Sequence, residues 1–375
     1  KIERHAFFMN AWFFFGKRRV NTKMNARYEL APQLKIYDII GIEWIPHLMF
    51  TQTRNFRSEI VNTDCHGLRF NEKPNLNQSV FDKKTTGKKS VLVGGSTAFG
   101  VGSSSDQKTI SSLLSNSTDC HFYNLGGRAF NGFQELILYQ SLIGKLNGIE
   151  KIVIFSGLND LYFFSGMNFD DNFIGPFFFG KQYFDTMNKE HLSPLRALAK
   201  LLLGSLISDK VNWGNITKDQ LLKYILNPNF RKDFNNTVLN PKAHMTLEDI
   251  VLRNLSLWSA ISRGLDIKVY YFLQPFLDWA KDPSKEEFKI IEFIQRNTKN
   301  FLPHKILDKI KSLDQYYSYQ ELLKTHCDKL NISFFDCNQM LKENSTKSDF
   351  LFVDRAHLND NGNNLVSNYI GDKIE

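Results

Sequence analysis

The chain has 375 residues, 42% of them hydrophobic and 23% charged, which allows a sizeable core and excludes a largely disordered protein. Its 47 Lys and Arg against 39 Asp and Glu give a formal charge of +8. This excess of positive charge is small for the length and is spread along the chain. Since no nucleic-acid-binding motif accompanies it, we expect no nucleic-acid partner. The four cysteines form no CxxC pair, which excludes a zinc knuckle, and we expect no metal.

Residues 1–87 predict an irregular, partly helical N-terminal arm. Within it, the apolar run 6–15 (AFFMNAWFFF) is followed by Lys17, Arg18 and Arg19. This pattern predicts an amphipathic or packed first helix, and peripheral contact with a membrane surface is the alternative. Further along the arm, Arg54, Arg57 and Arg69 form either a solvated basic loop or a site for a sugar acid.

The same composition features bear on the compartment. No run of 18 uncharged apolar residues is present, so we expect no transmembrane helix. The sparse cysteines favour the cytoplasm. Because the sequence starts at Lys1 rather than Met, a periplasmic or membrane-associated protein stays open.

From residue 88 onwards the pattern changes to short apolar, β-rich runs alternating with helical segments. The runs predict five buried strands, at residues 90–93, 121–125, 152–155, 268–273 and 332–335. Helical patterns lie between them, at residues 106–114, 132–146, 247–262, 286–295 and 316–330. Strand followed by helix, five times, is typical of an α/β fold with a doubly wound parallel sheet, here over residues 88–375.

The third and fourth strands are separated by about 110 residues, which is too long for one crossover. The first part is rich in Phe and the later part is helical, so we predict an inserted subdomain at about residues 161–265. Phe163 and Phe164 would line an apolar wall for the substrate, or would instead be core residues that join the insertion to the sheet.

Polar motifs follow three of the strands, and a fourth lies near the end of the chain. They are GGST at 94–97, NLGGRAFN at 124–131, GLND at 157–160 and DRAH at 354–357. Each alone is weak evidence, since glycine-rich turns and helix caps produce similar patterns. Because ligands bind at the carboxyl ends of parallel strands, we expect all four at one rim of the sheet.

These motifs contain the groups that acyl transfer needs. The hydroxyl of Ser96 needs a base, which His357 can supply, and Asp354 is close enough to orient that imidazole. Donors for an oxyanion are the backbone N–H of Ser96, a backbone N–H between Gly127 and Ala129, and the Asn159 amide. Arg128 is either a contact for an anionic substrate group or part of a structural ion pair.

In this order, the four motifs resemble the Ser, Gly, Asn and His blocks of the SGNH hydrolase family, also called GDSL-type esterases. The resemblance covers residues 88–160 and 265–372. It implies a flavodoxin-like three-layer α/β/α fold and no cofactor. It also implies Ser96 as nucleophile, Asn159 as oxyanion donor, His357 as base and Asp354 as its orienting partner.

Two positions depart from the family's pattern. Gly95 stands where the family's older motif has Asp, and Ala129 stands where the glycine that donates to the oxyanion would align. Since that donor is a backbone N–H, alanine can replace glycine unless the site needs a positive φ. Gly126 or Gly127 would then be the counterpart.

The expected function is that of a serine-dependent ester hydrolase or acyltransferase acting through a seryl acyl-enzyme. The expected partner is an acylated small molecule or glycan, preferably one with O-acetyl groups such as a bacterial surface polysaccharide. A lipase or thioesterase for longer acyl chains is one alternative. A non-catalytic glycan-binding or assembly protein with this fold is the other, and the oligomeric state stays open.

Overall fold

The computed structural model divides the chain into two compact units, Lys1–Met167 with Leu247–Glu375, and Asn168–Thr246. The sheet and the helices around it belong to the first of these units. The residues that the structure describes are 26–73, 76–81, 87–166, 177, 178, 180, 223, 227, 245–297 and 302–375.

A five-stranded parallel sheet forms the centre of the first unit, in the order β6-β5-β7-β8-β9. This order confirms the predicted flavodoxin-like α/β fold. The chain moves outward from β5 to β6 and then returns to β7 on the other side of β5. The topological switch point therefore lies after β5 and β7, where ligands bind in such sheets. The strands are β5 (Lys88–Gly94), β6 (Cys120–Gly126), β7 (Ile149–Ser156), β8 (Lys268–Leu273) and β9 (Ser333–Asp336).

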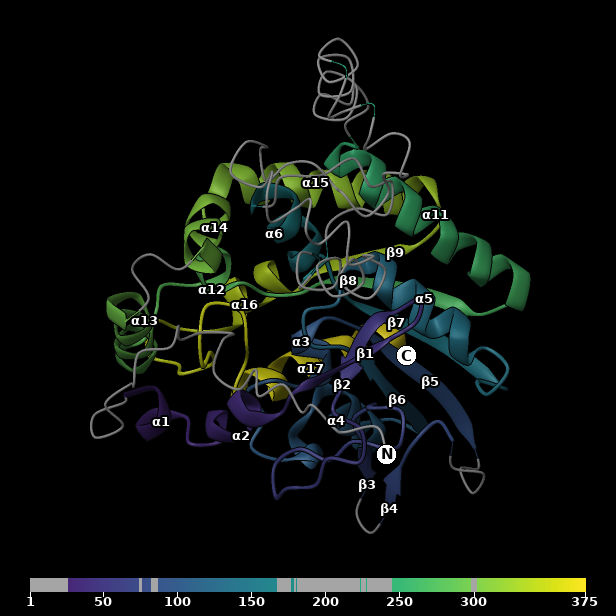
Figure 1. The fold of residues 1–375 in the computed structure, drawn as a ribbon, viewed down its shortest axis with the longest axis horizontal. Helices are drawn as coiled ribbons and strands as arrows, with labels where there is room; N and C mark the ends of the chain where they lie inside the picture. The colour runs from purple at the N-terminus through teal and green to yellow at the C-terminus, as the bar shows by residue number, and fades with distance from the viewer. Residues whose placement is uncertain are drawn as a thin grey trace. The chain divides into compact units, whose positions relative to one another are not determined.

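Helices cover both faces of the sheet, which gives the three layers seen in Figure 1. One layer contains α5 (Gly132–Leu142), α11 (Leu247–Leu265) and α15 (Leu313–Lys329). The opposite layer contains α4 (Ile110–Ser117), α16 (Cys337–Asn344) and α17 (Asp360–Ile374), whose apolar residues share a core with β5 to β8. Shorter or peripheral helices are α3 (Ser96–Phe99), α6 (Leu158–Gly166), α12 (Leu277–Ala280), α13 (Lys285–Asn297) and α14 (Leu302–Ile310).

The predicted helix at 106–114 is in fact two elements. A 3₁₀ turn covers Asp106–Lys108, and α4 starts only at Ile110. The break arises at Thr109, because its backbone is extended and its hydroxyl accepts a hydrogen bond from the N–H of Ser112. Threonine in this role favours a new helix start over a continuous helix.

The arm packs on the sheet domain from residue 26 onwards. It contains α1 (Ala26–Leu30), α2 (Leu34–Ile39), the hairpin β1–β2 (Ile42–Ile45 and Met49–Gln52) and the hairpin β3–β4 (Asn71–Lys73 and Leu76–Gln78). Leu34 and Tyr37 share a buried cluster with Phe99, Val101 and Val353 of the domain. The arm is therefore part of the first unit's core, whereas its apolar run 6–15 lies outside the described residues.

The second compact unit is narrower than the predicted insertion. Both α6 and α11 belong to the first unit, which shortens the insertion from 161–265 to Asn168–Thr246. The reason is side-chain packing: Trp258 of α11 is buried, and its ring meets that of Tyr139 of α5 edge to face at 5.4 Å. Among the described helices, none has the length and apolar character needed to span a bilayer.

Candidate active site

Three side chains form a continuous chain of hydrogen bonds at the carboxyl end of the sheet. The Oγ of Ser96 lies 2.7 Å from Nε2 of His357. On the other side of the ring, Nδ1 lies 2.7 Å from Oδ2 of Asp354 and 3.0 Å from Oδ1. The structure thus brings together residues 261 positions apart in the sequence, as the motifs predict.

The two glycines before Ser96 allow this part of the chain to pack closely. A Cβ on Gly94 would lie 2.1 Å from the carbonyl oxygen of Phe155, and one on Gly95 would lie 2.6 Å from Nδ2 of Asn159. Ser96 is the first residue of α3, directly after β5. Glycine at position 95, the departure from the family's pattern, therefore lets the Asn159 amide approach the serine turn.

A tight loop holds Asp354 and His357 in place. Oδ1 of Asp354 accepts hydrogen bonds from the backbone N–H groups of Ala356 (2.8 Å) and His357 (2.9 Å). Burial raises the pKa of Asp354, but the charge of His357 and these hydrogen bonds outweigh it and lower the pKa to about 2. The carboxylate therefore stays ionised and able to stabilise an imidazolium.

Thr97 links the turn at Ser96 to the loop of residues 354–357, which we call the histidine loop. Its hydroxyl donates to the carbonyl oxygen of Ala356 (3.1 Å) and accepts from Nε2 of Gln274 (3.2 Å), the residue that follows β8. The ends of β5 and β8 and the loop that carries His357 are joined in this way. Sequence reasoning missed this role of Gln274, whose only signal is its position directly after a predicted strand.

Arg355, between Asp354 and His357 in the same loop, is a second feature that the sequence did not reveal. Its guanidinium pairs with Asp278 (2.7 Å) and Asp308 (3.0 Å) and lies over the ring of Phe276. These contacts fasten the histidine loop to α12 and α14.

Fewer of the expected oxyanion donors are free to donate than the sequence indicates. Nδ2 of Asn159 donates to the carbonyl oxygen of Phe130 (2.7 Å) and has a second hydrogen to offer. The backbone N–H of Gly127 already donates to Gly94 (3.0 Å), which corrects the expectation that it serves an oxyanion. In the part of the chain that the structure describes, no hydrogen bond engages the backbone N–H of Ser96 or Ala129.

Ala129 adopts the left-handed backbone conformation, with φ of 62°. The site therefore does require a positive φ at this position, and alanine occupies it in place of the glycine that this conformation favours. The N–H groups of the alternatives, Gly126 and Gly127, donate to Oδ1 of Asn124 (2.9 Å) and to the carbonyl oxygen of Gly94 (3.0 Å), so Ala129 stays the candidate donor of this turn.

Two predicted substrate contacts are instead structural. Arg128 is buried, Nη1 donates to the carbonyl oxygen of Ile40 in the arm (2.6 Å), and burial lowers the pKa of its guanidinium to about 10. Phe163 is 1% exposed, as expected of a core residue, whereas Phe164 is half-buried. Arg128 therefore joins the turn of the second motif to the arm, a contact that the linear sequence does not show, and Phe163 is a core residue.

Next to Asn159 in the sequence, the half-buried Asp160 forms an acidic pair with the buried Glu135. Asp160 accepts from the backbone N–H of Gly132 (3.0 Å), so it caps the start of α5. Glu135 of α5 accepts from the hydroxyl of Ser156 (2.6 Å). Burial raises the pKa of both carboxyl groups, and the charge of Asp160 raises that of Glu135 further. Within the described ranges, no group of three or more His, Cys, Asp or Glu is arranged to hold a metal ion.

Comparisons with known proteins yield only similar structures. No family model and no curated protein matches the chain. Similar solved structures include the acetyl xylan esterase AlAXEase, with 11% identity, a TM-score of 0.35, and coverage of 76% of this chain and 100% of that one. A lipolytic G-D-S-L family protein from Veillonella parvula has 11% identity, a TM-score of 0.36, and coverage of 76% and 97%. An extracellular lipase from Streptomyces rimosus has 13% identity, a TM-score of 0.37, and coverage of 76% and 100%.

Proposed function

We propose that the protein is an SGNH-type serine ester hydrolase or acyltransferase that works through a seryl acyl-enzyme. The observation that carries the proposal is the hydrogen-bond chain from Ser96 through His357 to Asp354. A serine hydroxyl is a weak nucleophile on its own, and an imidazole oriented by a carboxylate is the arrangement that activates it.

In the proposed reaction, Oγ of Ser96 bonds to the ester carbonyl carbon while its proton passes to Nε2 of His357. The negative charge on the former carbonyl oxygen faces the N–H groups of Ser96 and Ala129 and the Asn159 amide. The intermediate collapses, the C–O bond to the leaving alcohol breaks, and that alcohol takes the proton from His357. Water, or a sugar hydroxyl in a transferase, then attacks the acyl-serine while His357 takes its proton. The bond between the acyl carbon and Oγ breaks, and Ser96 takes the proton back from His357.

As substrate class we propose small O-acyl groups, foremost acetyl, on a glycan or small molecule. Support for this preference comes from the family resemblance of the four motifs. Longer acyl chains define the lipase or thioesterase alternative. Turnover of p-nitrophenyl esters from acetate to palmitate separates the two, since a small-acyl enzyme loses kcat/KM as the chain lengthens.

The decisive test compares wild type with Ser96→Ala on p-nitrophenyl acetate. We expect the variant to lose at least about a thousandfold in kcat, because triad losses are of this size or larger. Ser117→Ala, at the end of α4, is the matched control and keeps wild-type turnover. Equal rates for wild type and Ser96→Ala would refute the esterase and favour a glycan-binding protein.

A further inference from the structure

An arginine of the arm is buried against the turn that carries Ser96. The side chain of Arg69 is 0% exposed. It follows a turn closed by Asp64, whose carboxylate accepts from the backbone N–H groups of His66 (2.8 Å) and Leu68 (3.0 Å). Both sequence-based alternatives for Arg69, a solvated loop and a sugar-acid site, require an accessible guanidinium, so its burial corrects them.

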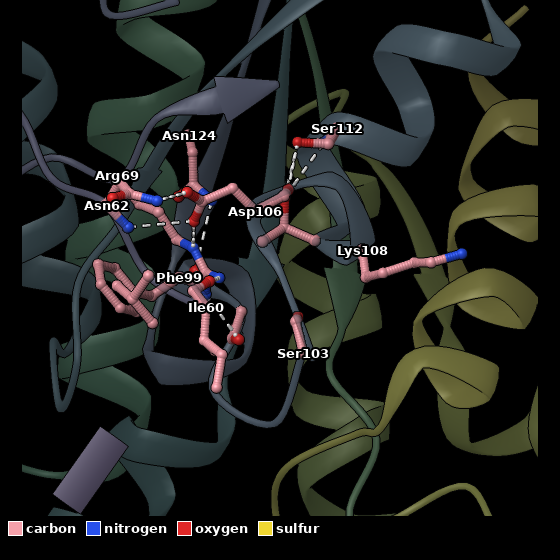
Figure 2. A network of polar contacts seen from close by, with 12 residues as sticks. Ile60, Asn62, Arg69, Phe99, Ser103, Asp106, Lys108, Ser112 and Asn124 are labelled. Atoms are coloured by element: carbon pink, nitrogen blue, oxygen red, sulfur yellow. Dashed lines mark hydrogen bonds and ion pairs between the residues drawn. The ribbon is translucent and has the colours of Figure 1, made fainter. Parts of the chain in front are cut away.

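The guanidinium of Arg69 is directed at the end of α3, as Figure 2 shows. Its Nη1 donates to the carbonyl oxygens of Phe99 (3.1 Å) and Gly100 (2.8 Å), the last residue of α3 and its C-cap. The hydroxyl of Tyr37, from α2, donates to the same Gly100 oxygen (2.7 Å). Carbonyls at a helix end lack partners within the helix, and positive charge is favourable there.

A buried ion pair fixes the guanidinium in this position. Nε of Arg69 lies 2.7 Å from Oδ1 of Asp106, whose side chain is 4% exposed. The other oxygen of Asp106 accepts from Nδ2 of Asn62 (2.7 Å). Nη2 of Arg69 donates to the carbonyl oxygen of Ile60 (2.8 Å). Because the planar guanidinium of Arg69 has several fixed hydrogen-bond acceptors, it has little freedom to rotate, and Arg69 is a rigid support.

The sheet also holds the end of the same helix. Nδ2 of Asn124, in β6, donates to the carbonyl oxygen of Ala98 (3.1 Å). Within α3, the carbonyl oxygen of Ser96 accepts from the N–H groups of Gly100 (3.1 Å) and Val101 (3.0 Å). Ser96 and Gly100 are thus the two ends of one hydrogen-bonded turn, so contacts that fix Gly100 also restrain Ser96.

We propose that Arg69, with Tyr37, is a positioning residue that holds the Ser96 turn at the correct distance from His357. The inference rests on the proposed function. It gives the arm a part in the reaction: the arm sets where the nucleophile lies without touching the substrate. A misplacement of about 1 Å at a reacting group can cost about a hundredfold in rate, so such a support matters for catalysis.

Two variants test the proposal, Tyr37→Phe and Arg69→Lys. We expect each to lower kcat by about tenfold with little change in KM, because one or two hydrogen bonds to α3 are lost while the substrate site stays intact. Hydrogen–deuterium exchange of the amides of residues 96–101 should become about tenfold faster in both. Tyr28→Phe is the matched control, because that hydroxyl donates to Asp38 (2.6 Å) within the arm and should change neither readout.

The two readouts separate this proposal from the proposed function. Unchanged exchange at residues 96–101 overturns the positioning role, whatever the activity. Faster exchange with wild-type kcat also overturns it, since α3 would then be held for stability alone. If wild type and Ser96→Ala prove equally inactive, the proposed function fails, and the exchange experiment alone decides whether Arg69 anchors the Ser96 turn.

Discussion

At the residue scale, Ala129 combines an unfavourable backbone conformation with a backbone donor. Its φ of 62° costs a non-glycine residue about 1–2 kcal/mol. We expect Ala129→Gly to keep turnover within about twofold, because the N–H stays in place. Ala129→Val should lose about 1 kcal/mol or more of unfolding free energy, since β-branched residues are least tolerated at positive φ. Urea unfolding and p-nitrophenyl acetate turnover measure both, and a large activity loss in Ala129→Gly would contradict the assignment.

Asp354 makes stability depend on acidic pH. Its pKa falls from 3.8 to about 2 on folding, so the native state binds fewer protons than the unfolded state between these values. The contribution, about 2 kcal/mol, is present above pH 4 and is lost as the pH falls towards 2. We expect the stability difference between wild type and Asp354→Asn to shrink over that range in urea titrations. A difference that stays constant from pH 5 to pH 2.5 would contradict the lowered pKa.

At the scale of elements, Glu135 couples α5 to β7 with the opposite pH dependence. Burial raises its pKa well above 4.5, so the folded protein retains a proton that the unfolded chain releases. Stability from this group is therefore complete below pH 4.5 and declines as the pH rises towards the folded pKa. Glu135→Gln keeps an acceptor for Ser156 and should gain stability over wild type between pH 5 and pH 8. Parallel stability curves for the two proteins would show that Glu135 is ionised in the fold.

At the scale of the whole molecule, the arm and the sheet domain should unfold together. Leu34 is 0% exposed in a cluster that includes Phe99 of α3 and Val353, which precedes the histidine loop. Leu34→Ala should cost about 2–5 kcal/mol of unfolding free energy, whereas the exposed neighbour Lys35→Ala should change it by less than about 0.5 kcal/mol. Loss of activity and loss of circular dichroism in urea should coincide. Activity that survives an earlier unfolding of the arm would contradict the shared core.

The strands and the four motifs were predictable because their signals are local. A strand buried on both faces needs a continuous apolar, β-rich run, so β8 was predicted to the residue at 268–273. The arm's two hairpins escaped prediction, because their short strands carry mixed polar and apolar residues. The limits of the insertion also escaped, since α11 belongs to the first unit through tertiary contacts such as the packing of Trp258 on Tyr139.

By itself, the sequence determined the α/β fold and singled out Ser96, Asn159, Asp354 and His357 as candidate site residues, because a parallel sheet brings the ends of its strands to one rim. Only the tertiary structure decided which polar groups are free to act. The backbone N–H of Gly127 donates to the carbonyl oxygen of Gly94. The side chains of Arg128 and Arg69 are buried between the arm and the domain. The physical reason is that a hydrogen-bond partner is set by distance in space, and these partners lie about 30 to 90 positions away along the chain.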